Sequence, residues 1–129
     1  MRSVNISSIL GKRAVPQTAG YAATKFALQA LSDGLRIEEE PHGIGVTVVC
    51  PGSTDTDFRD NEIAAGSVLL PNRPRVNMVS AERVAKATVK AIQRRHREIL
   101  ITPFNRFLNA LERVSPSLVD MALRRTFHR

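Results

Sequence analysis

The sequence is poor in cysteine and in aromatic residues. Its 129 residues contain one Cys, no Trp, one Tyr and five Phe. A single cysteine excludes an internal disulfide, and Cys50 lies in an apolar stretch, where a free cysteine usually serves as a small core residue. Unpaired thiols are typical of a reducing compartment, so we expect a cytoplasmic location. Because Tyr21 is the only tyrosine, a site that needs a phenol must be built around it.

Long hydrophobic runs are also missing. No apolar stretch approaches the roughly 20 residues that span a bilayer, so we expect no transmembrane span, and the first residues lead us to expect no signal peptide. Histidine, cysteine and carboxylate residues are not clustered at ligand spacings, so we predict no metal site. The rest of the composition is ordinary: 43% of residues are hydrophobic, which suits one globular domain.

Negative charge is scarce toward the end of the chain. The net charge is +7, and eight arginines occur from Arg94 onward against three acidic residues. A solvated helix face explains such a run most simply. No aromatic residue interrupts the basic segment 94–97 as a base-stacking platform would require, so we expect no nucleic acid partner. Weak contact between the basic tail and an anionic membrane surface stays open.

The first fifty residues have the pattern of a strand, a helix and a second strand. A short strand is expected over residues 3–8, followed by a loop over 9–17. Thr18 can cap a helix that runs to about Glu40. The β-branched run 44–50 predicts a strand that is buried on both faces. Such a crossover connects parallel strands, so the sequence predicts an α/β fold.

The second half of the chain has a weaker pattern. Residues 57–79 are irregular, with one short helix expected near 58–65. Ser80 is expected to cap a helix that extends to about Arg95. A third short strand is predicted over 98–102. Beyond it, apolar spacing from Phe104 to Val114 predicts an amphipathic helix, which Pro116 interrupts before a last turn or two over 118–124.

A serine hydroxyl, a tyrosine phenol and a lysine ammonium follow one another within eighteen residues of the sequence. Ser8 is the second of two serines at the end of the first strand, Tyr21 comes thirteen residues later and Lys25 four after that. Residues four apart share one face of a helix. The segment Pro51–Thr56 directly follows the second strand. Ligands bind beyond the carboxyl ends of strands in parallel α/β sheets, so we expect these groups at one edge.

These residue types suit proton transfer to a carbonyl. A free tyrosine has a pKa of about 10. The Lys25 ammonium can lower the pKa of Tyr21 by favouring the phenolate, and Ser8 can hydrogen-bond the same oxygen. This is a general acid–base arrangement for interconverting a carbonyl and an alcohol. Side chains do not accept hydride, so a cofactor is required.

The matching segments together resemble the classical short-chain dehydrogenase/reductase family. They are Val4–Ser8, Tyr21–Lys25, Pro51–Thr56 and Ser80–Ala85. The resemblance implies a Rossmann-type doubly wound parallel sheet. It also implies an NAD- or NADP-dependent oxidoreductase that acts on a small-molecule alcohol or carbonyl.

The resemblance assigns a role to each site residue. Ser8 would orient the substrate, Tyr21 would be the acid/base, and Lys25 would lower the pKa of Tyr21 and bind the nicotinamide ribose. Residues 57–79 would form a substrate lobe. The implied cofactor contacts border the nicotinamide, with the last of them near its carboxamide: Tyr21, Lys25, Pro51, Gly52, Thr54 and Thr56.

The sequence lacks the glycine-rich phosphate turn of that family. Only Gly11 and Gly20 precede Tyr21, and their spacing does not fit. The chain therefore resembles the carboxyl-terminal half of the fold, with about three strands and flanking helices, as a truncated chain or a partial sequence would. We expect a single partial domain, 1–129, made of a catalytic and nicotinamide-side segment (1–56), the substrate lobe (57–79) and a terminal helix, strand and basic helical tail (80–129).

Function by this chain alone is a separate question. The half that would bind adenosine and pyrophosphate is not in the sequence, so we predict weak dinucleotide binding and little or no turnover. The alternative is a non-catalytic dimerisation or interaction fragment, because the helix expected over 18–40 is apolar over a wide arc. In a longer protein the same helix would favour a homo-oligomer. The substrate, and the choice between NAD and NADP, stay open.

Overall fold

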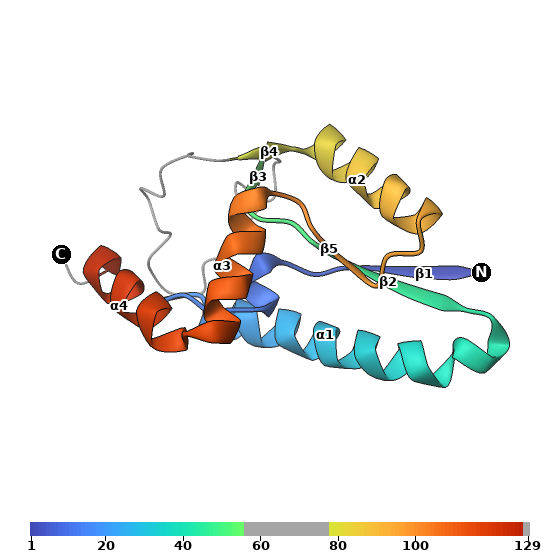
Figure 1. Ribbon diagram of the computed structural model, residues 1–129, viewed down its shortest axis with the longest axis horizontal. Helices are drawn as coiled ribbons and strands as arrows, with labels where there is room; N and C mark the ends of the chain where they lie inside the picture. Colours follow the sequence, from blue (N-terminus) through green and yellow to red (C-terminus); the bar gives the residue numbers. More distant parts are fainter. Residues whose placement is uncertain (56–77, 128–129) are drawn as a thin grey trace.

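The fold is organised around a small parallel sheet. The computed structural model describes residues 1–55 and 78–127. Three parallel strands have the order β1-β2-β5, with bounds Arg2–Ile6, Gly45–Cys50 and Glu98–Leu100 (Figure 1). The predicted α/β fold with parallel strands and flanking helices is therefore confirmed. The first and third strands end earlier than predicted, at Ile6 and Leu100.

The central strand β2 forms the core of the sheet. Its residues from Val46 to Cys50 are all buried, on both faces, as the β-branched run predicted. Val49 packs with Val79 and Ile101 in one buried cluster. Removing this much apolar surface from water is the main stabilising contribution that such a strand makes.

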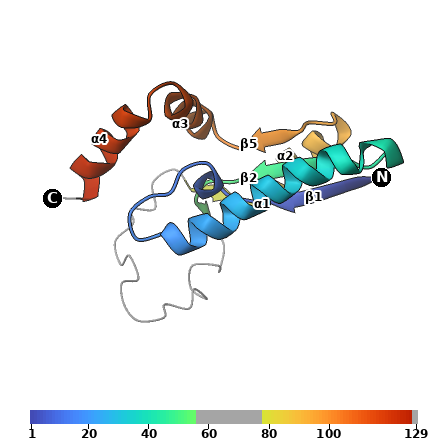
Figure 2. The ribbon, with the colours of Figure 1, turned by 90° about the horizontal axis from the view of Figure 1, so that it is seen from below.

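Two helices cover opposite faces of the sheet. The helix α1 (Ala19–Glu38) lies on one face and α2 (Ala81–Gln93) on the other, as Figures 1 and 2 both show. Thr18 is the residue before α1, but its side chain makes no capping bond and donates instead to the Val15 carbonyl oxygen at 2.9 Å. The predicted cap is wrong in that respect. Ser80 does cap α2, because its Oγ accepts from the Arg83 N–H at 3.3 Å.

Four short elements were not predicted. A 3₁₀ turn, η1 (Ile9–Gly11), occupies the start of the expected loop. A second parallel pair is formed by β3 (Thr54–Asp55) and β4 (Val79–Ser80). Two- and three-residue elements are too short for a sequence period to indicate them. A further 3₁₀ turn, η2 (Glu40–His42), follows the end of α1.

The end of the chain is a pair of helices at one end of the molecule. The helix α3 (Pro103–Val114) follows β5, and α4 (Pro116–Phe127) packs beside it (Figure 2). Pro116 does separate the two helices, but it starts α4 rather than merely interrupting a helix. The last helix is therefore longer than the turn or two expected over 118–124. Proline is well tolerated at this first helical position because its missing N–H has no partner there in any case.

Several predictions concern residues that lie outside the described ranges. They are Thr56, the helix expected near 58–65, and all of the substrate lobe except its last two positions. Among the described residues, no helix combines the length and apolar character needed to cross a bilayer. In the same residues, no three His, Cys, Asp or Glu side chains gather as metal ligands would.

Candidate active site

The carboxyl ends of β1 and β2 meet at one edge of the sheet, as predicted. The pairing continues past both strands: the Ser7 N–H donates to the Val49 carbonyl at 2.8 Å, and the Ile9 N–H donates to that of Pro51 at 2.9 Å. Ser8 lies between these two bonds. The structure therefore brings Ser8 and Pro51, which are far apart in the sequence, to neighbouring positions.

The two serines have different surroundings. The Ser7 hydroxyl is inside the fold, where it accepts from Gln29 Nε2 at 3.2 Å and donates to the Lys25 carbonyl oxygen at 3.4 Å. The Ser8 hydroxyl accepts from the Leu10 N–H at 3.1 Å and so begins η1. A hydroxyl also has one donor, which this bond does not use. Ser8 is thus the serine with hydrogen-bonding capacity to offer to another group.

Tyr21 and Lys25 lie one turn apart on α1 and contact each other. Lys25 Nζ is 5.6 Å from the centroid of the Tyr21 ring, within the range of a cation–π contact. The same Nζ donates to the carbonyl oxygen of Ile6, the last residue of β1, at 3.2 Å. Lys25 therefore connects the phenol on α1 with the strand end that leads into Ser8.

The Pro-Gly corner after β2 has a packing role that the sequence did not reveal. A Cβ at Gly52 would lie 2.6 Å from Asn105 Nδ2 of α3. The amide of Asn105 is therefore a close neighbour of Gly52, and a larger residue at this position would collide with it. Thr54 belongs to β3, and its hydroxyl donates to the Gly52 carbonyl at 3.2 Å. The Pro51 carbonyl oxygen accepts the hydrogen bond from the Ile9 N–H. Thr56 lies outside the described residues.

Gln29 is a buried residue near the site that sequence reasoning missed. It follows Lys25 by one helical turn, and its Nε2 donates to Ser7 Oγ and, at 3.0 Å, to Cys50 Sγ. The sequence does contain a signal for Gln29: it is a polar amide four residues after Lys25, on the side of the helix that packs against the sheet. Cys50 is fully buried, and burial is the main reason that its thiol pKa is raised to about 11. The thiol is therefore protonated near neutral pH.

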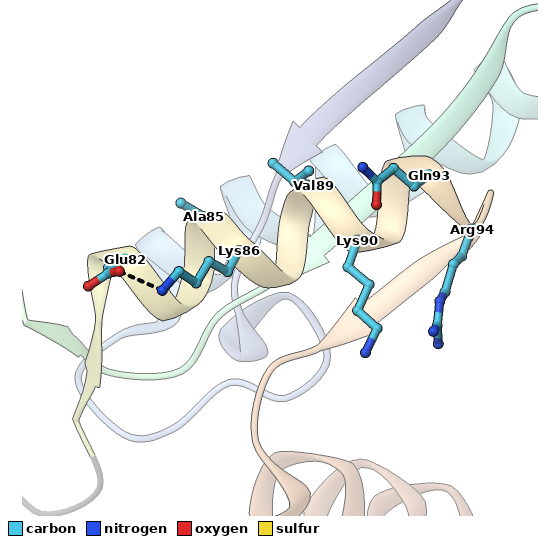
Figure 3. Close-up of a pocket in the computed structure, with 7 residues that line it drawn as sticks. All are labelled: Glu82, Ala85, Lys86, Val89, Lys90, Gln93 and Arg94. Atoms are coloured by element: carbon cyan, nitrogen blue, oxygen red, sulfur yellow. Dashed lines mark ion pairs between the residues drawn. The ribbon is translucent and has the colours of Figure 1, made fainter.

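A hollow elsewhere on the described surface involves none of these residues. It has a volume of about 510 Å³ and lies along the outer side of α2 (Figure 3). The residues that line it come from α2 and from Arg94, which directly follows the helix, and a Glu82–Lys86 ion pair of 2.6 Å crosses one end. Side chains of a single helix do not enclose a ligand, so this hollow is an open surface.

The segment that contains the site also matches a known family. A family model described as short chain dehydrogenase matches residues 2–66. The chain belongs to this family. The match includes Ser8, Tyr21, Lys25 and the segment 51–56, so the short-chain dehydrogenase assignment and the candidate site rest on the same part of the sequence.

Individual relatives agree with this assignment. A dehydrogenase/reductase SDR family protein 7-like of Anopheles gambiae is 33% identical over 104 residues, which cover 79% of this chain and 33% of that protein. Mouse mitochondrial D-beta-hydroxybutyrate dehydrogenase is 47% identical over 72 residues, which cover 56% of this chain and 19% of that protein. The chain thus spans about a third, or less, of the length of these relatives.

Solved structures show the same fold. A short chain dehydrogenase from Burkholderia cenocepacia, in complex with NADP, is 21% identical with a TM-score of 0.75, over 95% of this chain and 46% of that one. A short-chain dehydrogenase from Sphingobium yanoikuyae, in complex with NADPH, is 26% identical with a TM-score of 0.67, over 92% of this chain and 44% of that one. Short-chain dehydrogenases are oxidoreductases, and this chain has the fold of that family.

Proposed function

We propose that the chain provides the proton-transfer site of a short-chain dehydrogenase that interconverts an alcohol and a carbonyl. One observation supports this most strongly: Lys25 Nζ lies beside the Tyr21 ring and is held by the carbonyl at the end of β1. A fixed ammonium next to a phenol favours the phenolate, which is what a tyrosine acid/base needs. Tyr21 would give its proton to the carbonyl oxygen during reduction and take it back during oxidation.

Ser8 would act beside Tyr21 as the group that orients the substrate. Its hydroxyl donor is not used by the bond from Leu10, so it can donate to the oxygen that also meets Tyr21. A preorganised donor at the developing oxyanion stabilises the transition state. Ser7 is unsuited to this task because Gln29 and the Lys25 carbonyl already engage its hydroxyl.

The cofactor would be NAD or NADP, which supplies or accepts the hydride when bound. The donor set supports this: an ammonium has three N–H donors, and the bond from Lys25 to Ile6 uses one, so the others can reach ribose hydroxyls. We assign the nicotinamide side to Tyr21, Lys25 and the stretch from Pro51 and Gly52 to Thr54 and Thr56. The relatives solved with NADP, NAD or NADPH agree with this choice without deciding between them.

We further propose that these 129 residues correspond to the carboxyl-terminal part of the family fold and turn over little or nothing alone. The two solved relatives described above are matched over less than half of their chains, and the sequence has no glycine-rich phosphate turn. A dinucleotide would then be held by its nicotinamide side only. Titration of the purified chain with NADPH and NADH tests this, and micromolar affinity for either would contradict it.

The catalytic proposal is tested in a chimera. Residues 2–66 replace the corresponding segment of mouse D-beta-hydroxybutyrate dehydrogenase, and oxidation of D-beta-hydroxybutyrate is measured. We expect the chimera to be active and its Tyr21→Phe variant to lose at least about a hundredfold in kcat, because the acid/base is gone. Glu38→Gln, at an exposed position at the far end of the same helix, is the control and should stay close to the parent. Undiminished kcat in Tyr21→Phe would refute the proposal.

We also propose that α1 forms a homo-oligomer contact. The same contact would serve the alternative function, a non-catalytic dimerisation or interaction fragment. Phe26, Ala30 and Ile37 lie on one side of α1 and are exposed, Ile37 to 69%. Large apolar side chains gathered on one helix face are typical of a protein–protein contact.

We also propose a reducing cytoplasm as the location of the protein, since Cys50 is a buried free thiol.

The tail offers a second candidate function, weak contact with an anionic membrane surface. Phe104, Phe107 and Val114 of α3 are exposed, Val114 to 84%. Arg106 and Arg113 lie on the same helix, and amphipathic helices of this composition bind anionic lipid surfaces. Cosedimentation with vesicles that contain phosphatidylserine tests it. Retention that is equal for phosphatidylcholine vesicles, or unchanged in a Phe104→Ser/Phe107→Ser variant, would exclude it.

A further inference from the structure

A mostly apolar cavity adjoins the proposed site at the Pro-Gly corner. It lies between the loop that follows β1 and the helices α3 and α4, and its volume is about 320 Å³, near the lower end of the roughly 300–1,000 Å³ usual for small-molecule sites. Gly52 and Ser53, just after β2, line one part of it, and Ile9 and Leu10, which directly follow Ser8, line another. The cavity is therefore continuous with the edge of the sheet where the substrate would react.

The wall of the cavity is largely apolar on the side of α3 and α4. Three leucines and a valine of these helices line it: Leu108, Leu111, Leu123 and Val119. Aliphatic side chains offer no hydrogen bond, so a polar group placed against them loses its contact with water without compensation. An apolar group in the same place is stabilised, because its surface leaves water. The cavity therefore suits a ligand whose larger part is apolar.

The charged residues in the wall are already paired within the protein. Lys12 pairs with Glu98 of β5 at 2.5 Å. Arg13 pairs with Glu112 of α3 at 2.7 Å and also with Asp120 of α4. The second carboxylate oxygen of Glu112 is buried and does not face the cavity. A charged ligand would enter without a free counterion, and burying an unpaired charge is costly, so the cavity favours an uncharged ligand.

A neutral polar side chain in the wall is left without a partner. Asn105 of α3 is only 7% exposed, and its side-chain amide makes no hydrogen bond to any residue that the structure describes. The residue lines the cavity and lies against Gly52, where an added Cβ would come within 2.6 Å of Asn105 Nδ2. An amide both donates and accepts, and leaving it unpaired is unfavourable. A ligand oxygen at this end of the cavity would pair with it.

We propose that the substrate is an uncharged, mostly apolar ketone or alcohol with a second oxygen close to the reacting carbon, and that its apolar body occupies this cavity. The reacting oxygen meets Ser8 and Tyr21, the second oxygen pairs with the Asn105 amide, and the apolar body lies against α3 and α4. Asn105 is then a specificity-determining residue. The inference rests on the function proposed above and adds the class of substrate to it.

Two naphthyl ketones of the same shape test the second oxygen. 2-Hydroxy-1-(2-naphthyl)ethanone has a hydroxyl beside its carbonyl, and 1-(2-naphthyl)propan-1-one has a methyl group in that place. Equilibrium dialysis against the purified chain gives the affinity of each. We expect the wild type to bind the hydroxyketone about tenfold more tightly, as one hydrogen bond allows, and Asn105→Leu to lose this preference. Equal affinities in the wild type, or a preference that survives in Asn105→Leu, would overturn the proposal.

Asn109 provides the matched control. It also lines the cavity, one helical turn beyond Asn105 on α3, but it is only partly buried. We expect Asn109→Leu to keep the preference for the hydroxyketone. A preference lost in Asn109→Leu as completely as in Asn105→Leu would show that Asn105 does not bind the second oxygen, and would refute its assignment. Thermal melts establish that both variants are folded.

A second set of probes tests the charge and needs no variant. Methyl 6-propanoyl-2-naphthoate is uncharged, and its free acid is a carboxylate near neutral pH. We expect the carboxylate to bind at least about tenfold more weakly than the ester, because the cations in the wall are already paired. An analogue with an aminomethyl group in place of the ester is cationic and should bind as weakly. Either charged analogue bound as tightly as the ester would contradict the uncharged class.

The position of the reacting oxygen is tested at Ser8. We expect Ser8→Ala to weaken the binding of both naphthyl ketones alike, by about fivefold or more, because each loses one hydrogen bond. Unchanged affinities would show that the bound ketone does not reach the proposed site, and would refute its assignment as substrate. Dialysis needs neither cofactor nor turnover, and the chimera described above does not contain α3 and α4 of this chain. Failure of this inference and failure of the catalytic proposal are therefore told apart.

Discussion

At the scale of single residues, the site depends on two adjacent serines with opposite tasks. Spacing alone pointed to Ser8, and the structure explains why Ser7 could not replace it. Ser7 joins α1 to the sheet through Gln29 and the Lys25 carbonyl, whereas Ser8 opens the turn η1 and keeps a free donor on its hydroxyl. Ser7 therefore supports the packing, and Ser8 is the serine for which we propose a role in the chemistry.

The two serines should respond differently to loss of the hydroxyl. In the chimera described above, we expect Ser8→Ala to lower kcat about 10²-fold, with little change in the midpoint of denaturation. Ser7→Ala should instead cost about 1–2 kcal/mol of stability, because Gln29 loses a buried partner. Steady-state kinetics and urea denaturation of both variants decide the matter. The reverse pattern would show that the roles are assigned to the wrong serine.

Cys50 should make the stability depend on alkaline pH. Burial raises the pKa of this thiol to about 11, whereas in an unfolded chain it ionises near 8.5–9. Above the unfolded value, the unfolded chain releases this proton more readily than the folded chain. Ionisation of the thiol therefore favours unfolding, and stability falls as the pH rises toward about 11.

A comparison with Cys50→Ala isolates this contribution from the other groups that titrate in the same range. Between pH ~8 and ~10.5 the wild type should lose on the order of 1–2 kcal/mol more than Cys50→Ala. Urea denaturation at the two pH values measures the loss. If both proteins lose the same amount, the thiol ionises alike in the folded and unfolded states.

At the scale of elements, long periodic segments were predictable and short ones were not. The strand Gly45–Cys50 and the helices α1 and α2 were placed within one or two residues of their ends, because their apolar spacing is sustained. The pair β3–β4 and the turn η1 depend on distant contacts, such as the bond from the Val79 N–H to the Ser53 carbonyl. Such contacts have no local signature.

The same limit applies to particular side chains of the site. The spacing of Ser8, Tyr21 and Lys25 is local enough to be found in a sequence. Asn105, by contrast, comes close to Gly52 because α3 begins just after β5, the strand that pairs with β2. Arg13 meets Glu112 and Asp120 across about a hundred residues of chain, so no spacing rule could have paired them.

Two glycines near α1 should respond in opposite ways to an added methyl group. A Cβ at Gly11 would lie 2.7 Å from Ser7 Oγ and 3.0 Å from the Lys25 carbonyl oxygen, so η1 could not pack against α1 unchanged. We expect Gly11→Ala to lose about 1–3 kcal/mol of stability. Gly20, in the first turn of α1, has open space around it, and Gly20→Ala should stabilise by up to about 1 kcal/mol. Thermal or urea denaturation measures both, and a neutral Gly11→Ala would contradict the packing described.

At the scale of the whole molecule, the fold leaves apolar surface exposed on α1. The exposed residues are Phe26, Ala30 and Ile37, and α1 itself lies over one face of the sheet (Figure 2). If it joins two copies of the chain, Phe26→Asp should convert an oligomer into a monomer, because a carboxylate would be buried without a partner. Val89→Asp, at an equally exposed apolar position on α2, is the control and should not change the mass. Sedimentation velocity gives the masses, and a wild-type monomer at high concentration would refute the interface.

The central claim is that Lys25, held at the end of β1 beside the Tyr21 ring, supports proton transfer by Tyr21. In the chimera described above, we predict that Lys25→Met lowers kcat for oxidation of D-beta-hydroxybutyrate at least about tenfold, because the positive charge beside the phenol is lost. Lys12→Met removes a lysine that does not contact Tyr21 and should leave kcat close to that of the parent chimera. An unchanged kcat in Lys25→Met would contradict the account.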